Sequence, residues 1–311
     1  MTPRMHVMSI TPFDARGALD EAALRAHVHR LADAGIGVFL GSYGTGEGKL
    51  LRGDEVRRLY AVGVEASDGR VPVVAAALGL GATDDVVERA REARALGVDA
   101  VQIHPPLAGP ATIAPRENEI DAYYDAVLAA LDFPLVLSNE VLMVGYGLAP
   151  ERMCALAASH RQVVGINWTD PDPSSLARVV RGLADAERAV PVRVGLTAQL
   201  PLALVLGAEG LVSFEANVVP ALCADVARAF DAGDLAAFRA RFARLMDWNL
   251  ALGRAMTPRS VKAVLAARGE PGTALRAPYR ALDGELAHWL ERDVARIEAA
   301  GARDATEEGT R

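Results

Sequence analysis

Residues 84–104 read DDVVERAREARALGVDAVQIH and contain one complete helix-to-strand unit. Apolar residues recur at helical spacing over Asp84–Leu96, and Gly97 follows at a position that suits a helix C-cap. The β-rich run Ala100–His104 comes next and is mostly apolar. Such strands are typical of parallel sheets that are covered on both faces.

The same alternation of short β-rich runs and longer amphipathic stretches occurs eight times. Other helical patterns cover Glu21–Ala34, Asp54–Ala66 and Glu119–Leu131. Eight βα units over about 230 residues match the size of a TIM barrel. A doubly wound sheet is the alternative, but it ordinarily has fewer strands and a nucleotide-type glycine fingerprint after the first strand. The expected strands are Val7–Thr11, Gly37–Gly41, Val71–Ala76, Ala100–His104, Leu135–Asn139, Val163–Asn167, Val192–Gly195 and Gly210–Phe214.

The C-terminal part of the chain follows a different pattern. Three helices are expected, at Leu235–Leu252, Pro258–Ala267 and Arg280–Ala300. The sequence therefore predicts a (β/α)8 TIM barrel over residues 1–232 and a C-terminal helical extension, packed on the barrel, over residues 233–300. The polar residues 301–311 are expected to form a disordered tail.

Composition excludes several classes of function. The chain of 311 residues has a net charge of −7 and no run of Lys or Arg, which argues against nucleic-acid binding. No apolar stretch reaches the ~18 residues of a membrane span, and the first residues lack a signal-peptide pattern. Cys154 and Cys223 lack metal-ligand spacing and are expected to be reduced thiols. We expect a cytoplasmic protein without a cofactor, and Lys49 and Lys262 are its only lysines.

Barrel enzymes place their sites at the carboxyl ends of the strands, which directs attention to the glycine-rich residues 41–49. Alternating glycines allow backbone N–H groups to converge on an anion, with Thr45 as a further donor. A phosphate-binding loop is excluded because Tyr43 stands where its first glycine is required and Leu50 follows Lys49. A small-carboxylate site is preferred over a tight turn without a ligand.

Several motifs, in order along the chain, resemble the dihydrodipicolinate synthase/N-acetylneuraminate lyase family. The resemblance runs from about residue 5 to residue 285. It implies that Gly44, Thr45 and Gly46 hold the carboxylate of a 2-oxo acid, with the main chain near Val212 on the other side. The motifs are Thr11-Pro-Phe13, Gly44-Thr-Gly-Glu47, Asp68-Gly-Arg-Val-Pro-Val73, Val164-Gly-Ile166, Gly210-Leu-Val-Ser213 with Ala216-Asn-Val218, and Leu275-Arg-Ala-Pro278.

The chain departs from this family pattern at the residues that carry the chemistry. The family has a lysine at the end of the sixth strand, whose amine forms an imine with the substrate, and Asn167 stands at that place. The family's catalytic tyrosine at the end of strand five is matched by Ser138. An imine on Lys49 would be a relocated mechanism, whereas Lys262 is expected to be a structural or surface residue.

His104, Glu140 and Asn167 end or follow neighbouring expected strands, which lie ~5 Å apart in a barrel. A histidine and a carboxylate can act as acid and base, and Asn167 can donate a hydrogen bond to a developing oxyanion. Each has a structural alternative: His104 as the partner of a loop carbonyl, Glu140 as a solvated or paired charge, and Asn167 as a satisfied core amide. A divalent metal on His104, Glu140 and Asp170 and a nucleophilic Ser138–His104 pair are weaker alternatives, and no metal is expected.

These residues predict a lyase-like enzyme that makes or breaks a C–C or C–O bond of a small 2-oxo or related carboxylic acid, without an imine. The alternative is a non-catalytic barrel that binds a small acid or serves assembly. An enzyme should keep a polar pocket around His104, Glu140 and Asn167, whereas a retired barrel should have an apolar one. The resemblance further implies a homodimer or homotetramer.

Overall fold

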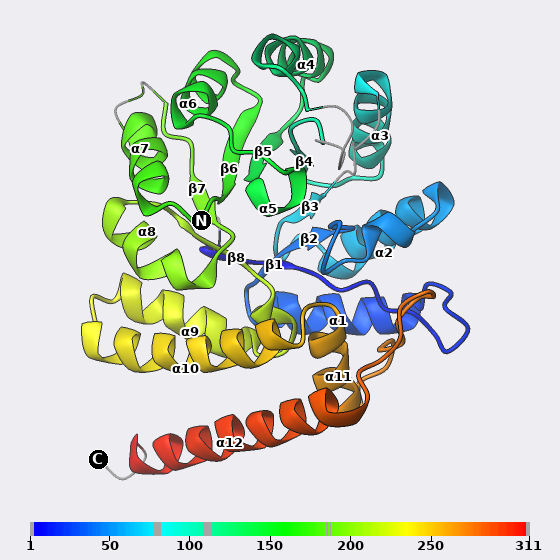
Figure 1. The fold of residues 1–311 in the computed structure, drawn as a ribbon, viewed down its shortest axis with the longest axis vertical. Helices are drawn as coiled ribbons and strands as arrows, with labels where there is room; N and C mark the ends of the chain where they lie inside the picture. Colours follow the sequence, from blue (N-terminus) through cyan, green and yellow to red (C-terminus); the bar gives the residue numbers. More distant parts are fainter. Residues whose placement is uncertain (1–2, 77–81, 108–113, 185, 187, 309–311) are drawn as a thin grey trace.

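Parallel strands close into a barrel in the computed structural model of the chain, which describes residues 3–76, 82–107, 114–184, 186 and 188–308. The strands follow one another around the barrel in chain order, and β1 closes the ring on β8 with His6 opposite Val212 (Figure 1). The predicted (β/α)8 architecture is thus confirmed. The strands are β1 (Met5–Met8), β2 (Gly37–Leu40), β3 (Val73–Ala75), β4 (Ala100–Ile103), β5 (Leu135–Glu140), β6 (Val163–Thr169), β7 (Val192–Val194) and β8 (Gly210–Ser213).

Helices surround the strands and connect each one to the next (Figure 1). Gly35, Gly97 and Gly207 follow helix ends with φ of 72°, 91° and 97°, the left-handed conformation expected of C-terminal caps. The helices of the barrel are α1 (Glu21–Asp33), α2 (Gly53–Ser67), α3 (Thr83–Ala95), α4 (Glu117–Ala130), α5 (Val141–Val144), α6 (Pro150–Ser159), α7 (Pro173–Ala184), α8 (Leu200–Leu206) and α9 (Pro220–Asp231), with the short turns η1 (Gly48–Leu50), η2 (Thr197–Gln199) and η3 (Glu215–Asn217).

Alternate side chains of the strands belong to two different cores. Phe39, Val74, Ala100, Val136 and Val212 form a small apolar cluster inside the barrel. Their neighbours along the strands point outward and join the large cluster between strands and helices. Because side chains alternate along a strand, the inner cluster fixes which residues of each strand face the interior.

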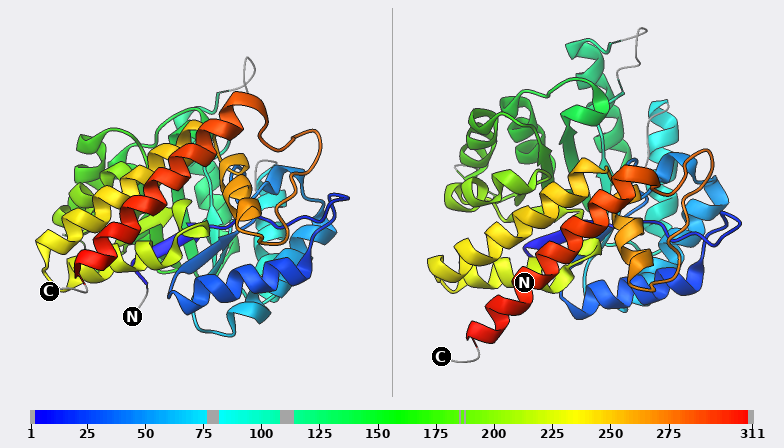
Figure 2. Two further views of the ribbon diagram at one scale, coloured as in Figure 1. Left: turned by 90° about the horizontal axis from the view of Figure 1, so that it is seen from below. Right: turned by 60° about the horizontal axis from the view of Figure 1, so that its bottom comes forward.

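Three further helices complete the structure after the barrel: α10 (Leu235–Arg254), α11 (Arg259–Ala267) and α12 (Gly284–Glu308). α10 packs on α9, and α12 packs on α10 and α11 (Figure 2). Trp248, Val261 and Leu290 are buried in the cluster between these helices. α12 starts four residues later than expected and continues to Glu308, into the segment that we expected to be a disordered tail. Alanines recur in this segment, and alanine strongly favours helix.

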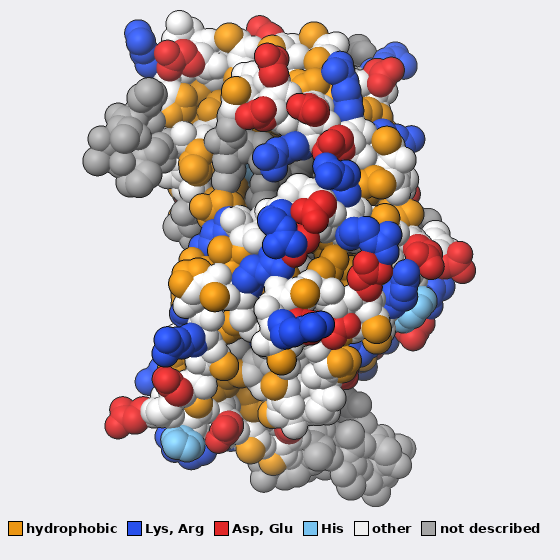
Figure 3. Space-filling model, turned by 90° about the vertical axis from the view of Figure 1, so that its right-hand side faces the viewer, with side chains coloured by type: hydrophobic (Ala, Val, Ile, Leu, Met, Phe, Trp, Pro, Cys, Tyr) orange, Lys and Arg blue, Asp and Glu red, His pale blue; other side chains and the backbone are white. Residues whose placement is uncertain are grey.

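The side of the molecule that carries α2 and α3 mixes the two signs of charge (Figure 3). Ion pairs join neighbouring helices there, such as Arg57 with Glu92 at 3.5 Å and Arg58 with Glu21 at 2.5 Å. Within the described residues, no helix combines the length and the apolar character that crossing a membrane requires.

Candidate active site

Polar side chains replace apolar ones in the barrel interior toward the carboxyl ends of β4, β5 and β6. Ala100 and Val136 belong to the interior apolar cluster. Two residues further along the same strands, Gln102 and Ser138 therefore face the interior as well. Asn167 on β6 lies directly beside Ser138 in the strand register. All three side chains are buried, so the interior of the barrel changes from apolar to polar at this level.

Hydrogen bonds join two of these side chains, Asn167 and Gln102, to His104, which follows β4. Asn167 donates from Nδ2 to Oε1 of Gln102 at 3.1 Å, and Gln102 Nε2 lies 2.9 Å from Nε2 of His104. Burial lowers the pKa of His104 to about 4, so its imidazole is neutral at pH 7. The predicted pair His104 and Asn167 is thus connected, through a residue that the sequence analysis did not single out.

Several polar atoms in this interior have no partner among the described residues. They are Asn167 Oδ1, Ser138 Oγ and His104 Nδ1. Buried polar atoms are nearly always paired with protein, water or a ligand. Unpaired atoms from three neighbouring strands are therefore typical of a site that accepts a polar molecule.

Glu140 is the last residue of β5 and carries the only carboxylate on that strand. It is half-buried and lies beside Thr169 of β6 in the register. Desolvation raises the pKa of its carboxyl group. Among the described residues the Glu140 carboxylate forms no hydrogen bond or ion pair, so it is not joined directly to His104 or Asn167.

Trp168 and Asp170, close to Asn167 in sequence, both make their contacts outside the barrel interior. The indole of Trp168 points outward into the core between strands and helices. The Asp170 carboxylate accepts hydrogen bonds from Ser175 Oγ at 3.0 Å and from the Asp172 backbone at 2.9 Å. Asp170 is therefore engaged with the start of α7, which does not favour the metal alternative.

Three backbone donors of the glycine-rich loop form hydrogen bonds within the loop. Gly46 donates to Ser42 Oγ at 2.8 Å, Glu47 to the Gly44 carbonyl at 3.0 Å, and Gly48 to the Ser42 carbonyl at 2.9 Å. A Cβ atom at Gly46 would lie 2.7 Å from the Ser42 nitrogen, so glycine is required there. In the described structure the N–H groups of Gly44 and Thr45, but not that of Gly46, remain without a partner.

Thr45 connects this loop to the C-terminal part of the chain. Its hydroxyl lies 3.0 Å from that of Thr257, which follows α10. Thr45 is buried, whereas Gly44 is exposed. Thr257, 212 positions further along the chain, therefore supports Thr45 of the predicted carboxylate site.

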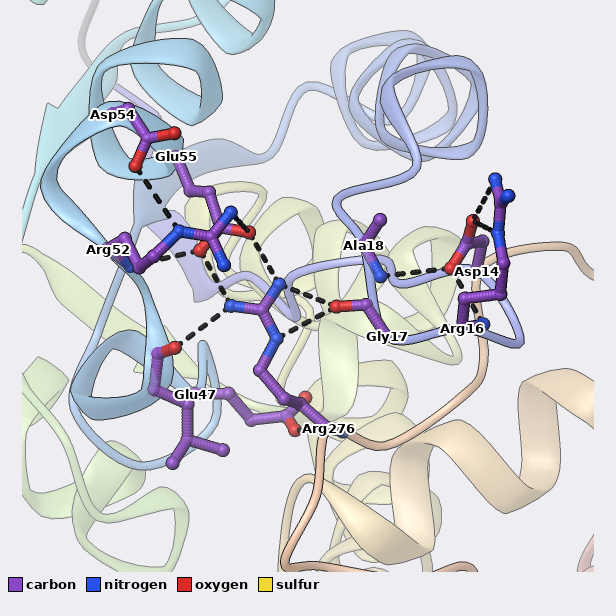
Figure 4. A network of polar contacts seen from close by, with 10 residues as sticks. Asp14, Arg16, Gly17, Ala18, Glu47, Arg52, Asp54, Glu55 and Arg276 are labelled. Carbon is purple, nitrogen blue, oxygen red and sulfur yellow. Dashed lines mark hydrogen bonds and ion pairs between the residues drawn. The ribbon is translucent and has the colours of Figure 1, made fainter.

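Two cations from the C-terminal part, the buried Lys262 and the half-buried Arg276, contact the other side of the loop. Lys262 of α11 pairs with Glu47, and both are buried, so that of the two expected roles for Lys262, structural or surface, the structure shows the structural one. Arg276 donates to both carboxylate oxygens of Glu55 at 2.7 and 2.6 Å and to the Leu50 carbonyl at 2.9 Å (Figure 4). Arg276 belongs to the Leu275-Arg-Ala-Pro278 motif, so this motif connects the C-terminal segment to Leu50 and to Glu55 of α2.

The predicted site residues thus fall into two groups. His104, Ser138 and Asn167 lie together in the interior, with Glu140 at the end of β5, and Thr45 lies in the glycine loop. The side chain of Val212 is part of the apolar cluster. Gln102 was missed, although a polar residue within the otherwise apolar strand β4 was a signal that could have identified it.

Comparison with known proteins agrees with the resemblance in the motifs. The model of the dihydrodipicolinate synthetase family matches residues 2–297. The chain is 32% identical over 286 residues to a 4-hydroxy-tetrahydrodipicolinate synthase of Hyphomonas neptunium, covering 92% of this chain and 95% of the relative. It is 33% identical over 292 residues to an uncharacterized DapA-like lyase of Halobacterium salinarum, covering 92% and 91%.

Solved structures share the fold over nearly the whole chain. A crystal structure from Pseudomonas aeruginosa superimposes with a TM-score of 0.87 at 28% identity and covers 96% of this chain and 100% of that one. The dihydrodipicolinate synthase of Thermotoga maritima has the same fold, with a TM-score of 0.88 at 24% identity over 96% of this chain and 99% of that one. The chain therefore belongs to the dihydrodipicolinate synthetase family.

Proposed function

We propose that this protein is a lyase that acts on a small 2-oxo acid through acid–base chemistry, without an imine. The relatives named as a synthase and a lyase support the reaction class. The imine-free part rests on Asn167, which the sequence motif places where the family has its lysine and whose amide is hydrogen-bonded to Gln102 in the barrel interior. An amide nitrogen is not a nucleophile and forms no adduct with a ketone.

The reaction requires a base, a site for negative charge and a site for the carboxylate. We assign the base to Glu140, whose raised pKa makes it a better proton acceptor than an ordinary carboxylate. It takes a proton from the carbon next to the carbonyl, and the electron pair moves onto the carbonyl oxygen. Asn167 and Ser138 donate hydrogen bonds to that oxygen, and the N–H groups of Gly44 and Thr45 bind the carboxylate.

A barrel retained only for assembly or small-acid binding is the alternative. A barrel retained only for assembly has no need of a polar interior, because unpaired buried polar atoms cost about 1–3 kcal/mol each. The unpaired atoms of Asn167 and Ser138, counted among described residues, favour a site that meets a polar ligand. Exchange of the substrate's protons distinguishes turnover from binding.

The test is exchange of the methyl protons of pyruvate in D2O, followed by proton NMR, together with a panel of longer 2-oxo acids. An enzyme that forms an enolate should accelerate exchange of the protons next to the carbonyl for at least one acid. Glu140→Gln should abolish the acceleration, because its amide is not a base. Binding of an acid without any exchange would support the non-catalytic alternative and contradict the proposed function.

A further inference from the structure

Gln102 lies between His104 and Asn167 and is the only side chain that connects them among the described residues. It is fully buried, and its two partners are 3% and 1% exposed. The two hydrogen bonds measure 2.9 and 3.1 Å. A primary amide has a donor end and an acceptor end, so the direction of one of these bonds fixes the direction of the other.

In the structure, the two hydrogen bonds are donated in the direction from Asn167 to His104. Asn167 Nδ2 donates to Gln102 Oε1, and Gln102 Nε2 then donates to His104 Nε2. His104 Nε2 must therefore carry a lone pair, which places the ring proton on Nδ1. The carbonyl oxygen of Asn167, Oδ1, is left without a partner in the described part of the chain.

The opposite direction uses almost the same positions of the heavy atoms. When His104 carries its proton on Nε2, it donates to Gln102 Oε1, and Gln102 Nε2 donates to Asn167 Oδ1. Both amides turn by 180°, which exchanges nitrogen and oxygen, and Asn167 then presents its NH2 group to the interior. The ring gives one proton to solvent and takes one from it, so its charge does not change.

We infer that Gln102 is a positioning residue that couples the tautomer of His104 to the end of the Asn167 amide that meets the substrate. The inference rests on the proposed function only for the identity of the ligand. With His104 protonated on Nε2, the site offers a donor to the oxygen of a 2-oxo acid. With His104 protonated on Nδ1, it offers an acceptor to the hydroxyl of a 2-hydroxy acid. Because burial keeps His104 neutral, these two tautomers are the relevant forms at pH 7.

The coupling is tested without any ligand, by 15N NMR of the His104 ring at pH 8. Asn167→Asp places there a carboxylate that only accepts, so Gln102 must donate to it and His104 must move its proton to Nε2. Gln102→Glu places an acceptor directly against His104 and should also move the proton to Nε2, which shows that the ring follows its hydrogen-bond partner; if Asn167→Asp does not fold, the ligand titrations decide the coupling to Asn167. The ratio of the two tautomers should change about tenfold or more, since mismatched buried hydrogen bonds are that unfavourable.

Gln102→Leu is the matched control, because it removes the link and retains a buried side chain of similar length. In Gln102→Leu, adding Asn167→Asp should leave the His104 tautomer unchanged. The inference is overturned if the ring nitrogens of His104 are the same in the wild type and in the acidic variants. It is also overturned if the change persists in the Gln102→Leu background.

Ligands provide a second readout with the wild-type protein. Pyruvate should increase the Nε2–H form of His104, and lactate should increase the Nδ1–H form. Binding of pyruvate without a change in the ring would show that the site does not use the coupling, and would overturn the inference. If no acid binds, the proposed function fails, while the ligand-free variants still decide whether Gln102 couples the two residues.

Discussion

Asn167 on β6 donates a hydrogen bond of 3.1 Å to Gln102 on β4, across the intervening strand β5. The two side chains meet over Ser138, which lies beside Asn167 on β5. A small residue at 138 leaves space for this contact inside the barrel. The amide of Asn167 is thus held in a fixed position in the barrel interior by its partner.

Reductive trapping should therefore detect no imine. Borohydride added together with pyruvate is expected to leave the mass of the protein unchanged, because Asn167 is not an amine. Lys262 is buried against Glu47, and Lys49 is exposed with its amine 5.0 Å from the Tyr279 ring centre. Intact-protein mass spectrometry is the measurement. An increase that depends on pyruvate and maps to Lys49 would establish a relocated imine.

Asn167→Lys should not restore aldolase turnover in a coupled assay for pyruvate release. The new amine would lie in a buried interior beside Gln102, where desolvation lowers its pKa and makes its charge unfavourable. Ser138 also lacks the phenol that the family's tyrosine supplies, and catalytic groups that act together gain little from one restored member. Ser138→Tyr alone and the double variant are the controls. Turnover in Asn167→Lys alone would contradict the expectation.

Thr45→Val should weaken binding of the substrate acid by about 1–3 kcal/mol, the effect of removing one buried hydrogen-bonding group from a ligand site. Titration calorimetry with the acid identified by the exchange experiment measures it. Thr257→Val is the matched control, since it removes the hydroxyl 3.0 Å from Thr45 and leaves Thr45 itself in place. Equal losses in the two variants would mean that Thr45 supports the loop and does not contact the ligand.

Glu140→Gln should lower kcat/KM by about 10²–10⁴-fold, the usual contribution of a general base. A base works when it is ionised, so kcat/KM of the wild type should rise as the pH rises through the raised pKa of Glu140. The same rise should be absent in Glu140→Gln. An identical pH profile in both proteins would assign the base to another residue.

The raised pKa of Glu140 also has a consequence for stability. A carboxyl group whose folded pKa lies above its unfolded value favours folding at low pH, and this contribution is lost as the pH rises through the folded pKa. Glu140→Gln should therefore be more stable than the wild type at pH 8 and similar to it near pH 4. Thermal unfolding at the two pH values is the measurement.

Arg276→Met should destabilise the fold by about 3 kcal/mol, as expected when one partner of a largely buried ion pair is removed. Hydrogen bonding to Arg276 is the largest cause that lowers the pKa of Glu55. The pair therefore stabilises the protein at pH values above the unfolded pKa of a glutamate, and this stability is lost as the pH falls through the folded pKa. Urea unfolding at pH 7 and pH 3 should show a smaller difference between variant and wild type at pH 3.

Arg16→Met is the control for this pair, because the Arg16 side chain is 89% exposed and lies 3.3 Å from Asp14 (Figure 4). Exposed ion pairs contribute about 0–1 kcal/mol. A similar loss in Arg16→Met and Arg276→Met would mean that burial does not set the strength of the Arg276 contact.

We expect the protein to be a homodimer or homotetramer. Val205 of α8 is 79% exposed, and Leu235 and Leu250 of α10 are 71% and 65% exposed in the single chain. Light scattering at micromolar concentration should give a multiple of 32.8 kDa. Val205→Asp and Leu250→Asp, measured separately, identify which helix lies in the interface. A mass of one chain for the wild type would contradict this prediction.

The barrel could be predicted because its signals are local. Apolar strands, helical spacing and glycines such as Gly97 each depend on neighbouring residues in the chain. The place of Asn167 on β6 could also be predicted, since the sequence around it could be compared with a family motif. The partner of Asn167 could not be, because Gln102 is 65 residues away and their contact depends on the register of three strands. The contacts of Lys262 with Glu47 and of Thr257 with Thr45 are still more distant, at 215 and 212 residues apart in sequence.

The attachment of the glycine loop to Thr257, Lys262 and Arg276 limits how this barrel can be reused. A chain cut after residue 232 would keep every strand but would lose the cation that pairs with Glu47 and one of the two arginines that pair with Glu55. Recombination with a homologous barrel should therefore exchange the loop at 41–50 and the segment at 257–276 as one block. A chimera that takes only one of the two would inherit half of a matched set of charges.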